Sequence, residues 1–444
     1  MATVDAPLEP PARRLPFGVR LPDAVSVLGV RDFRVIWLGQ AISMTGTWMQ
    51  AIAQGLLVLE LWDSALGLGI VNFSNALPSL VVMLFGGVLA DRADKRRILL
   101  VTQVVMMLIA VALGALVLTD RVEFWMVVVA AAMLGIAFGY DMPAYQAFLP
   151  ELVPPEKIGQ VVALNSSTFH GTRMIGPAMA GILIGAFGLA TAYFLNAASF
   201  LAVLFSLLIL RYRPKPRPAG PQMGAVDGLK EGLRHVRSRP HLQSLLWLTA
   251  LNTTLIFPIV AILTPFYVTD VLDAGPGTLG LLWASSGIGS LAGAMALIWW
   301  PNESRASRIW LAVVVAPVGL TIMALTRNAA VAIGIQTVIS FSFSSQLGII
   351  SMMMQESTPP AFRGRVMSVN GIAFNGTVPF AALAASGLTA VVGLPAVMIG
   401  AGGLYLALAV MLLLRVGGGI HQVATKTRLE YEALTVATAG APGH

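Results

Sequence analysis

The chain contains no cysteine and little charge, and both absences narrow what it can be. Without cysteine, disulfides, thiolate catalysis and cysteine metal sites are excluded. Only 11% of its 444 residues are charged and 57% are hydrophobic, whereas soluble proteins carry about 25% charged residues. The composition therefore predicts an all-α integral membrane protein rather than two or three soluble domains.

Several catalytic signatures are also missing. The sequence has no H-E-x-x-H, no G-x-S-x-G and no pair of catalytic acids, so an intramembrane enzyme is disfavoured. It has no G-x-x-x-x-G-K-[ST] loop, which removes an ATP-driven pump within this chain. We expect no catalytic residue, no metal and no cofactor. From Met1 to Arg31 the chain is basic and rich in proline, without an apolar core, so no signal peptide is expected.

Long apolar runs fill most of the chain. A helix that crosses about 30 Å of hydrocarbon needs roughly 20 apolar residues. Runs of this kind predict about twelve spans, at 34–61, 66–90, 98–118, 124–148, 158–187, 189–210, 242–271, 279–300, 307–325, 329–354, 366–392 and 394–414. The predicted domains are a tail (1–33), a six-helix bundle (34–211), a linker (212–241), a second six-helix bundle (242–415) and a tail (416–444).

Lysine and arginine lie almost entirely on one side of these spans. The opposite side carries only Arg121 and Arg327. The positive-inside rule then places both termini and the central linker in the cytoplasm. The net charge of +7 is accordingly a topology signal and an attraction to anionic lipid, and it does not indicate nucleic-acid binding. In the linker, Leu229, Leu233 and Val236 recur at helical spacing, which indicates either an interfacial helix or a flexible tether with chance periodicity.

The two halves repeat one pattern at a constant offset. Pro155, Gly159 and Asn165 recur as Pro360, Gly364 and Asn370, and 360 − 155, 364 − 159 and 370 − 165 all equal 205. Duplicated membrane modules of this kind are how many secondary transporters are built.

A second pattern lies between the second and third spans, where residues 86–97 read GGVLADRADKRR. Glycine allows close helix approach, and a carboxylate at the membrane boundary can pair with a cation or a helix N-terminus in one conformation and release it in another. The string predicts a conformational gate made by Gly87, Asp91, Arg92, Lys95, Arg96 and Arg97.

This string resembles the loop 2–3 signature of the major facilitator superfamily, with Asp94 where many members have glycine. The resemblance covers nearly all twelve spans. Residues 34–40, 46–50, 141–143, 146–151, 163–167, 173, 176–177, 181 and 194–197 resemble the branch of enterobactin-exporter-like and macrolide-efflux-like permeases, the transmembrane secretion effectors. It implies two pseudo-symmetric six-helix bundles, a central cavity, alternating access and a monomer in the inner membrane of a bacterium. In the second half the loop signature is degenerate at 301–305.

The fifth span contains a glycine-rich stretch with Gly171, Gly176, Pro177 and Gly181. Glycine offers small surfaces for packing, and proline removes a backbone hydrogen bond and bends the helix. The stretch is similar to the antiporter motif of superfamily exporters, which implies export; ordinary small-residue packing is the alternative. Because alanines and Ser386 replace the motif in the repeat, the bend is expected in the first half only.

Ionisable groups inside spans are costly and usually face a partner or a wet cavity. Asp141 in the fourth span and Arg173 in the fifth are predicted to form a charge pair, either a static bridge or a proton-coupled one. His170 lies one turn from Arg173 and is a packing residue or a relay. No span of the second half carries an acid at mid-membrane, so proton coupling would depend on the first half.

Polar and aromatic side chains in the spans are candidates for a cavity lining. They are Gln40, Trp48, Gln50, Gln54, Asn165, Asn252, Gln336, Gln346, Asn370 and Asn375. Such a lining favours bulky amphipathic molecules, although amides in spans often only join helices. We expect a proton-driven exporter of drug-like or siderophore-like small molecules; the alternatives are an uptake permease of the same fold, as symporter or facilitator, and a membrane protein without transport activity.

Overall fold

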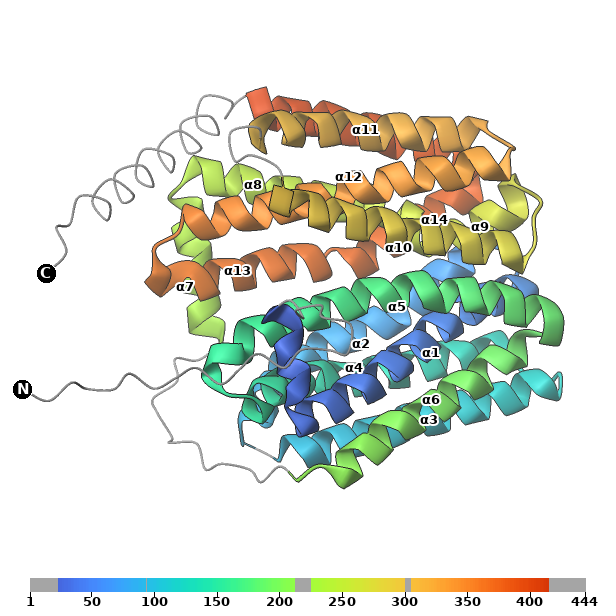
Figure 1. Cartoon of the computed structure of the whole chain (residues 1–444). Coiled ribbons are helices and arrows are strands. Elements are labelled where there is room, and N and C mark those ends of the chain that lie inside the picture. The colour runs from blue at the N-terminus through green and yellow to red at the C-terminus, as the bar shows by residue number, and fades with distance from the viewer. Residues whose placement is uncertain (1–22, 93, 212–224, 300–304, 415–444) are drawn as a thin grey trace, which may run out of the picture.

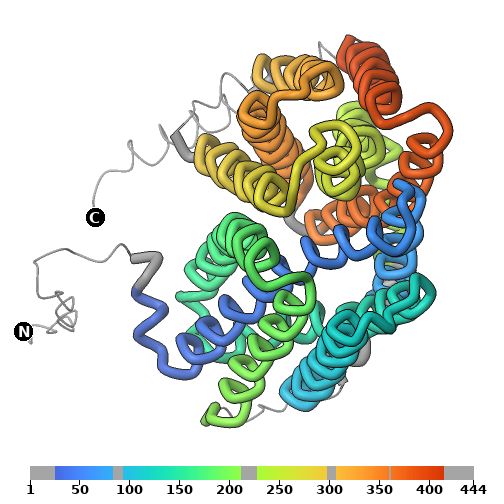
Figure 2. The backbone as a smooth tube through the Cα atoms, turned by 90° about the vertical axis from the view of Figure 1, so that its right-hand side faces the viewer, coloured from blue at the N-terminus to red at the C-terminus, as the bar shows by residue number. Residues whose placement is uncertain are grey.

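The computed structural model describes residues 23–92, 94–211, 225–299 and 305–414, and every regular element in these ranges is a helix. The helices form two groups, drawn blue to green and yellow to red in Figures 1 and 2. The predicted all-α membrane fold is confirmed.

The first group consists of α1 (Arg31–Leu61), α2 (Ala65–Arg92), α3 (Lys95–Leu118), α4 (Phe124–Phe148), α5 (Ile158–Phe187) and α6 (Leu189–Ile209), with short 3-10 helices η1 (Asp23–Gly29), η2 (Leu149–Leu152) and η3 (Pro155–Lys157). These bounds agree with the predicted spans to within three residues. Gly188 alone separates α5 from α6, and its φ of 82° is a conformation that glycine adopts without strain. Gly393, at 393 − 188 = 205 residues further on, has a φ of 80° and ends α14.

The linker carries α7 (Ala225–Arg237), followed by the second group of helices. That group consists of α8 (Pro240–Leu251), the π-helical turns η4 (Asn252–Ile256) and η5 (Pro258–Ile262), α9 (Thr264–Phe266), η6 (Tyr267–Val271), α10 (Pro276–Trp299), α11 (Arg305–Leu325), α12 (Ala329–Glu356), α13 (Pro360–Asn375), α14 (Val378–Val392) and a last helix over Leu394–Leu414. The seventh span is therefore a chain of short helical pieces, because Pro258 and Pro265 each remove a backbone donor.

A bend was expected in the first half only, but the helix of the second half is also irregular, because it is broken between α13 and α14. Pro177 lies inside one continuous α5, whereas the equivalent span of the second half is interrupted at Gly376 and Thr377, between α13 and α14. Pro379 lacks an N–H that could bond to the carbonyl of Asn375, four residues earlier, so the interruption occurs there.

Ten helical segments in the described ranges are long and apolar enough to cross a membrane. Two further helices, α1 with 31 residues and α5 with 30, have sufficient length but are more polar and are not among the ten. Polar side chains on a membrane helix normally face protein or a wet cavity. α1 and α5 are thus candidates for lining a site.

The two groups of helices meet mainly where α5 packs on α10 and α2 on α14. Small residues permit this approach: a Cβ on Gly181 would lie 3.2 Å from the Cα of Gly280, and one on Gly69 would lie 2.6 Å from the Cβ of Ser386. These positions are near the beginnings of α2 and α10 and the ends of α5 and α14, all on the predicted outer side. The bundles are therefore closed together at that end.

The same face of α5 is open at the other end. Pro177 and Met174 continue the contact with α10 from Gly181, and Ser167 and Ala163 continue the same face at helical spacing. Ser167 and Ala163 are exposed. The bundles therefore separate toward the predicted cytoplasmic side, and the crevice between them opens there.

Candidate functional site

A cluster of polar and aromatic side chains lies where α1, α5 and α10 meet. Arg173 of α5 donates from Nη2 to the Oγ of Ser286 on α10, at 3.3 Å, and Ser340 of α12 donates to the same oxygen at 2.8 Å. The Arg173–Ser286 bond crosses from one bundle to the other. It is a direct polar contact between the two halves of the chain.

Aromatic rings surround the guanidinium. It lies 5.7 Å from the ring centroid of Trp48 on α1, within the range of a cation–π contact. Trp48 makes edge contacts with Phe169 of α5 at 5.8 Å and with Trp283 of α10 at 5.9 Å. Phe169 in turn contacts His170 at 5.6 Å. We call Trp48, Phe169, Arg173, Trp283 and Ser286 the interbundle cluster.

The glycine-rich stretch of α5 positions this cluster. A Cβ on Gly176 would lie 2.7 Å from the Cβ of Trp48 and 2.7 Å from the carbonyl oxygen of Thr45, so only glycine lets α5 lie against α1 there. Gly181 makes the corresponding approach to α10. A Cβ on Gly171 would meet nothing within 4 Å. The prediction of close packing at Gly171 is wrong, since that position faces open space.

The predicted charge pair between Asp141 and Arg173 is not formed in this conformation. Asp141 is 5% exposed and accepts hydrogen bonds from Thr102 Oγ1 at 2.6 Å and from Gln103 Nε2 at 3.1 Å, both on α3. The prediction assumed that consecutive spans are neighbours, but α4 packs on α2 and α3, and α5 packs on α1 and α10. Asp141 accordingly points into the first bundle and not into the crevice.

Two buried polar atoms near Asp141 lack a hydrogen-bond partner among the described residues. The Tyr145 hydroxyl, one turn further along α4, and Gln103 Oε1 are buried without a hydrogen-bond partner in the described part of the chain. Sequence reasoning missed Thr102 and Gln103. Their signal was two adjacent polar residues in the otherwise apolar run 98–118.

Four of the predicted cavity amides lie inside the bundles instead. Asn196 of α6 donates to Gln50 at 2.7 Å, and Asn252 donates to Gln346 at 2.6 Å. Gln346 also donates to the hydroxyl of Tyr405, at 2.9 Å, and Gln336 donates to the carbonyl of Val260 at 2.9 Å. For Gln50, Asn252, Gln336 and Gln346 the lining prediction is wrong, because a buried amide pairs with another polar group across a helix contact. Such bonds join helices within each bundle.

The other predicted lining residues are more accessible. Gln40, Trp48, Gln54, Asn165 and Asn370 are half-buried, and Asn375 is exposed. Asn370 accepts a bond from Thr249 at 3.0 Å, and Asn375 donates to the carbonyl of Gly371 at 3.2 Å. His170 is half-buried, and its Nδ1 has no partner in the described ranges. Of this set, Trp48 is the one that belongs to the interbundle cluster.

The basic residues of the predicted gate make contacts within the first bundle. Lys95 pairs with Glu151 at 3.1 Å, Arg96 donates to the carbonyl of Leu208 at 3.1 Å, and Arg97 lies 3.7 Å from Asp94. Asp94 also accepts a hydrogen bond from the backbone of Arg96 at 3.0 Å and so caps the start of α3. The side chains of Asp91 and Arg92, and the surroundings of Gly87, lie outside what the structure describes.

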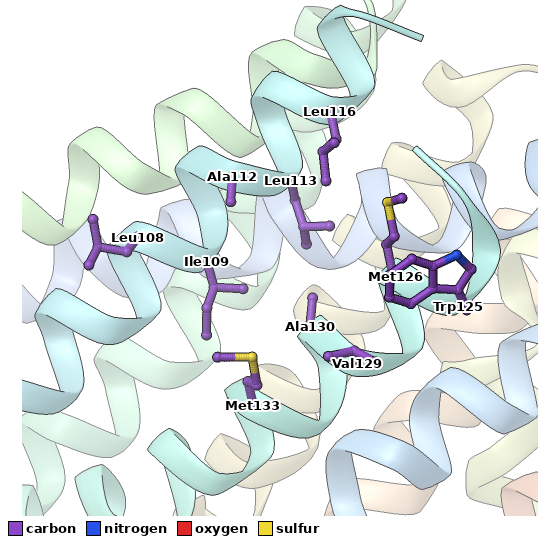
Figure 3. A pocket seen from close by; sticks show the side chains of 10 residues that line it. All are labelled: Leu108, Ile109, Ala112, Leu113, Leu116, Trp125, Met126, Val129, Ala130 and Met133. Atoms are coloured by element: carbon purple, nitrogen blue, oxygen red, sulfur yellow. The ribbon is translucent and has the colours of Figure 1, made fainter. Parts of the chain in front are cut away.

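A groove of about 340 Å³ runs between α3 and α4, on the outer half of the same helix pair that holds Asp141 (Figure 3). It is lined by Leu108, Ile109, Ala112, Leu113, Leu116, Trp125, Met126, Val129, Ala130 and Met133. The indole N–H of Trp125, the one polar group in this lining, donates to Glu123 at 2.7 Å. The groove thus offers hydrocarbon surface and no group that would select a polar molecule.

Metal chemistry finds no support in the described ranges. They contain no group of three or more histidine, aspartate or glutamate side chains that could hold an ion. The chemistry available at the interbundle cluster is instead hydrogen bonding, cation–π contact and apolar burial.

Comparison with known proteins gives a consistent result. A family model described as transmembrane secretion effector matches residues 24–439. The chain is 26% identical to the multidrug efflux pump Tap of Mycolicibacterium fortuitum over 359 residues, which cover 79% of this chain and 87% of that protein. It is 24% identical to macrolide efflux protein A of Streptococcus pyogenes over 347 residues, or 76% and 84% of the two chains.

The chain also resembles one further transporter over a shorter stretch of sequence, and it resembles a solved transporter structure in its fold. The staphyloferrin A transporter of Staphylococcus aureus is 31% identical over 164 residues, covering 36% of this chain and 41% of that protein. A bacterial homologue of the iron transporter ferroportin, solved in an inward-facing state, superposes with a TM-score of 0.65 at 16% identity, over 86% of this chain and 98% of that chain. At such low identity the superposition supports the fold alone.

Proposed function

Because the chain belongs to the transmembrane secretion effector family of the major facilitator superfamily and is a membrane transporter, we propose that it exports amphipathic small molecules in exchange for protons. Relatives over most of its length are named as efflux proteins, which supports the outward direction and drug-like cargo. The staphyloferrin A transporter extends the range to siderophore-like cargo. On this proposal the protein works as a monomer surrounded by lipid in a bacterial inner membrane, with both termini in the cytoplasm.

The observation that carries proton exchange is the environment of Asp141. The described residues include no cation in contact with this carboxylate, and its two hydrogen-bond donors are neutral. Burying an unpaired carboxylate costs free energy, and binding a proton removes that cost. Asp141 is thus suited to gain and lose a proton as the packing of α3 on α4 changes between conformations.

The arrangement of the bundles supports loading from the cytoplasm. The halves touch near Gly181 and Gly280, whereas Ala163 and Ser167 of α5 are exposed at the other end. A substrate then enters from inside and meets the interbundle cluster. After the bundles rock, the gate residues 87, 91, 92 and 95–97 close the cytoplasmic end.

Proteoliposomes with an imposed pH gradient test this function. The purified protein is reconstituted, and a mixed panel of macrolides, cationic drugs and siderophores is followed across the membrane by mass spectrometry. An antiporter moves substrate toward the acidic side, a symporter toward the alkaline side, and a facilitator moves it without regard to pH. Accumulation on the alkaline side, or transport that ignores the gradient, would establish the uptake alternative.

The role of Asp141 is tested by Asp141→Asn. If the carboxylate carries the proton, the variant loses gradient-driven accumulation but keeps exchange of labelled for unlabelled substrate. Asp273→Asn is the matched control, because it makes the same change at an exposed outer position, where φ is 49° and asparagine is tolerated. Loss of both exchange and thermal stability in Asp141→Asn would mean that the carboxylate only holds α3 to α4.

A further inference from the structure

Arg173 is a cation in the middle of a membrane helix, and its charge is only partly compensated. Among the described residues its one hydrogen-bond partner is Ser286, although a guanidinium has five N–H donors. No carboxylate of the described residues lies within 4 Å, since none of the ion pairs found there includes Arg173. The Trp48 ring adds a cation–π contact. Within the described ranges the positive charge of Arg173 therefore has no counter-charge.

The rest of the guanidinium is not sealed inside the protein. Several buried polar atoms lack a partner in the described ranges, and no nitrogen of Arg173 is among them. The N–H groups that make no hydrogen bond are therefore not completely enclosed. Arg173 itself is half-buried, on the helix that lines the crevice with Ser167 and Ala163.

From this geometry we infer that the interbundle cluster binds the carboxylate of an amphipathic organic anion, with Arg173 on the charge and Trp48, Phe169 and Trp283 on the apolar body. A planar guanidinium can bind a carboxylate in a bidentate manner, through two parallel N–H···O hydrogen bonds. Rings within 6 Å of one another provide the apolar wall beside it. This inference rests on the proposed export function and names the class of molecule that the exporter selects.

The position of Arg173 along α5 favours such a substrate over a lipid headgroup as the bound anion. Arg173 lies 173 − 158 = 15 residues from the start of α5 and 187 − 173 = 14 from its end. At 1.5 Å per residue this is about 22 Å from one end and about 21 Å from the other. Lipid phosphates lie at the membrane surfaces, so they do not reach the cluster, whereas a molecule in the crevice does.

Binding at Arg173 also affects the contact between the bundles. Ser286 receives bonds from both Arg173 and Ser340, so it retains a partner within its own bundle when Arg173 turns to an anion. The anion would thus replace a bond that joins the halves. This couples occupancy of the cluster to their separation.

The test measures binding rather than transport, so that it does not depend on the direction or coupling of export. The full-length protein in phosphatidylcholine nanodiscs is titrated by calorimetry with 1-naphthaleneacetate and with its uncharged partner, 1-naphthaleneacetamide. The acid should bind about ten to a hundred times more tightly than the amide, because a hydrogen bond to a charged group is worth about 1.5–3 kcal/mol. Arg173→Gln should remove this preference, and Arg173→Lys should retain part of it.

Two further variants separate charge recognition from folding. Trp48→Phe should weaken both probes to a similar degree and leave their ratio unchanged. Ser286→Ala should keep the preference for the acid. Equal affinity of the wild type for acid and amide, no saturable binding of the acid, or an unchanged preference in a folded Arg173→Gln variant would overturn the inference. If the acid preference is found but no gradient-driven export is, the proposed function fails and the binding site stands.

Discussion

Closure of the outer end depends on backbone contact between α5 and α10, and one methyl group should disturb it. A Cβ on Gly280 would lie 2.6 Å from the carbonyl oxygen of Pro177 and 3.0 Å from the Cα of Gly181. Both are backbone atoms, so no side-chain rotation can relieve the clash. Gly280→Ala should therefore force the outer halves apart and disfavour the conformation that opens toward the cytoplasm.

The size of this effect follows from the cost of overpacking. Inserting a methyl group into a tight contact costs about 1–3 kcal/mol. If the contact exists only in the inward-open state, the ratio of inward-open to outward-open molecules falls by about 5- to 150-fold. Gly277 offers a matched control on the same helix, because a Cβ there would meet nothing within 4 Å.

The absence of cysteine makes the assay direct. A single Ser167→Cys reporter is placed on the α5 face that is exposed toward the cytoplasm, and its alkylation by a membrane-impermeant maleimide is timed in everted vesicles. Labelling should slow in the Gly280→Ala background and stay at the reference rate in the Gly277→Ala background. Unchanged labelling in Gly280→Ala, or equal slowing by both substitutions, would refute the role assigned to this contact.

Three further predictions concern other contacts. Lys95→Ala and Glu151→Ala should each lower stability by about 1–3 kcal/mol, because the ion pair is largely buried and each change leaves one charged group without this partner. Their combined effect in thermal unfolding should be smaller than the sum, and additive losses would mean that the two side chains do not interact. Gly393→Ala should destabilise by about 1–3 kcal/mol, because φ is 80° and ψ is 152° there, a region that only glycine adopts readily. Gly403→Ala, with nothing within 4 Å and no positive φ, should be neutral in the same assay. Desolvation, followed by the charge of Arg239, lowers the pKa of His235 from its ordinary 6.5. The backbone amides of α7, where His235 stacks on Phe362 of α13, should therefore be most protected from hydrogen exchange above pH 6.5 and lose protection as the pH falls below it. A His235→Gln variant should show no such dependence.

The interbundle cluster indicates which features of a transporter site a sequence reveals. Arg173 could be selected from the sequence because a charge is unusual in an apolar span, and Trp48 because it lies in a stretch that resembles the exporter branch. Their partners could not. Ser286 is 113 residues from Arg173, and a serine in a membrane span is too common to attract notice. Trp283 and Phe169 read as ordinary apolar residues until the helices are placed together.

Asp141 gives the opposite lesson. The sequence showed that a carboxylate inside a membrane costs free energy, so a partner for Asp141 was expected. The partner predicted from the sequence was Arg173, and that prediction was wrong. Arg173 is the nearest opposite charge along the spans, yet Asp141 is held by the neutral Thr102 and Gln103. Neighbouring helices in the chain are not necessarily neighbours in space: after η2 and η3 the chain packs α5 on α1 and α10, whereas α4 packs on α2 and α3.

The sequence by itself determined the helices of the first bundle to within three residues, and it revealed the duplication. Apolar run length sets where a span begins and ends, and a glycine such as Gly188 or Gly393 stops a helix through its own backbone conformation; these are local properties of the chain. Only the tertiary structure decided which buried polar groups meet and which end of the bundle interface is closed. Those outcomes depend on how closely helices can approach at positions such as Gly181 and Gly280, and that distance is a property of two surfaces together, which no single stretch of sequence contains.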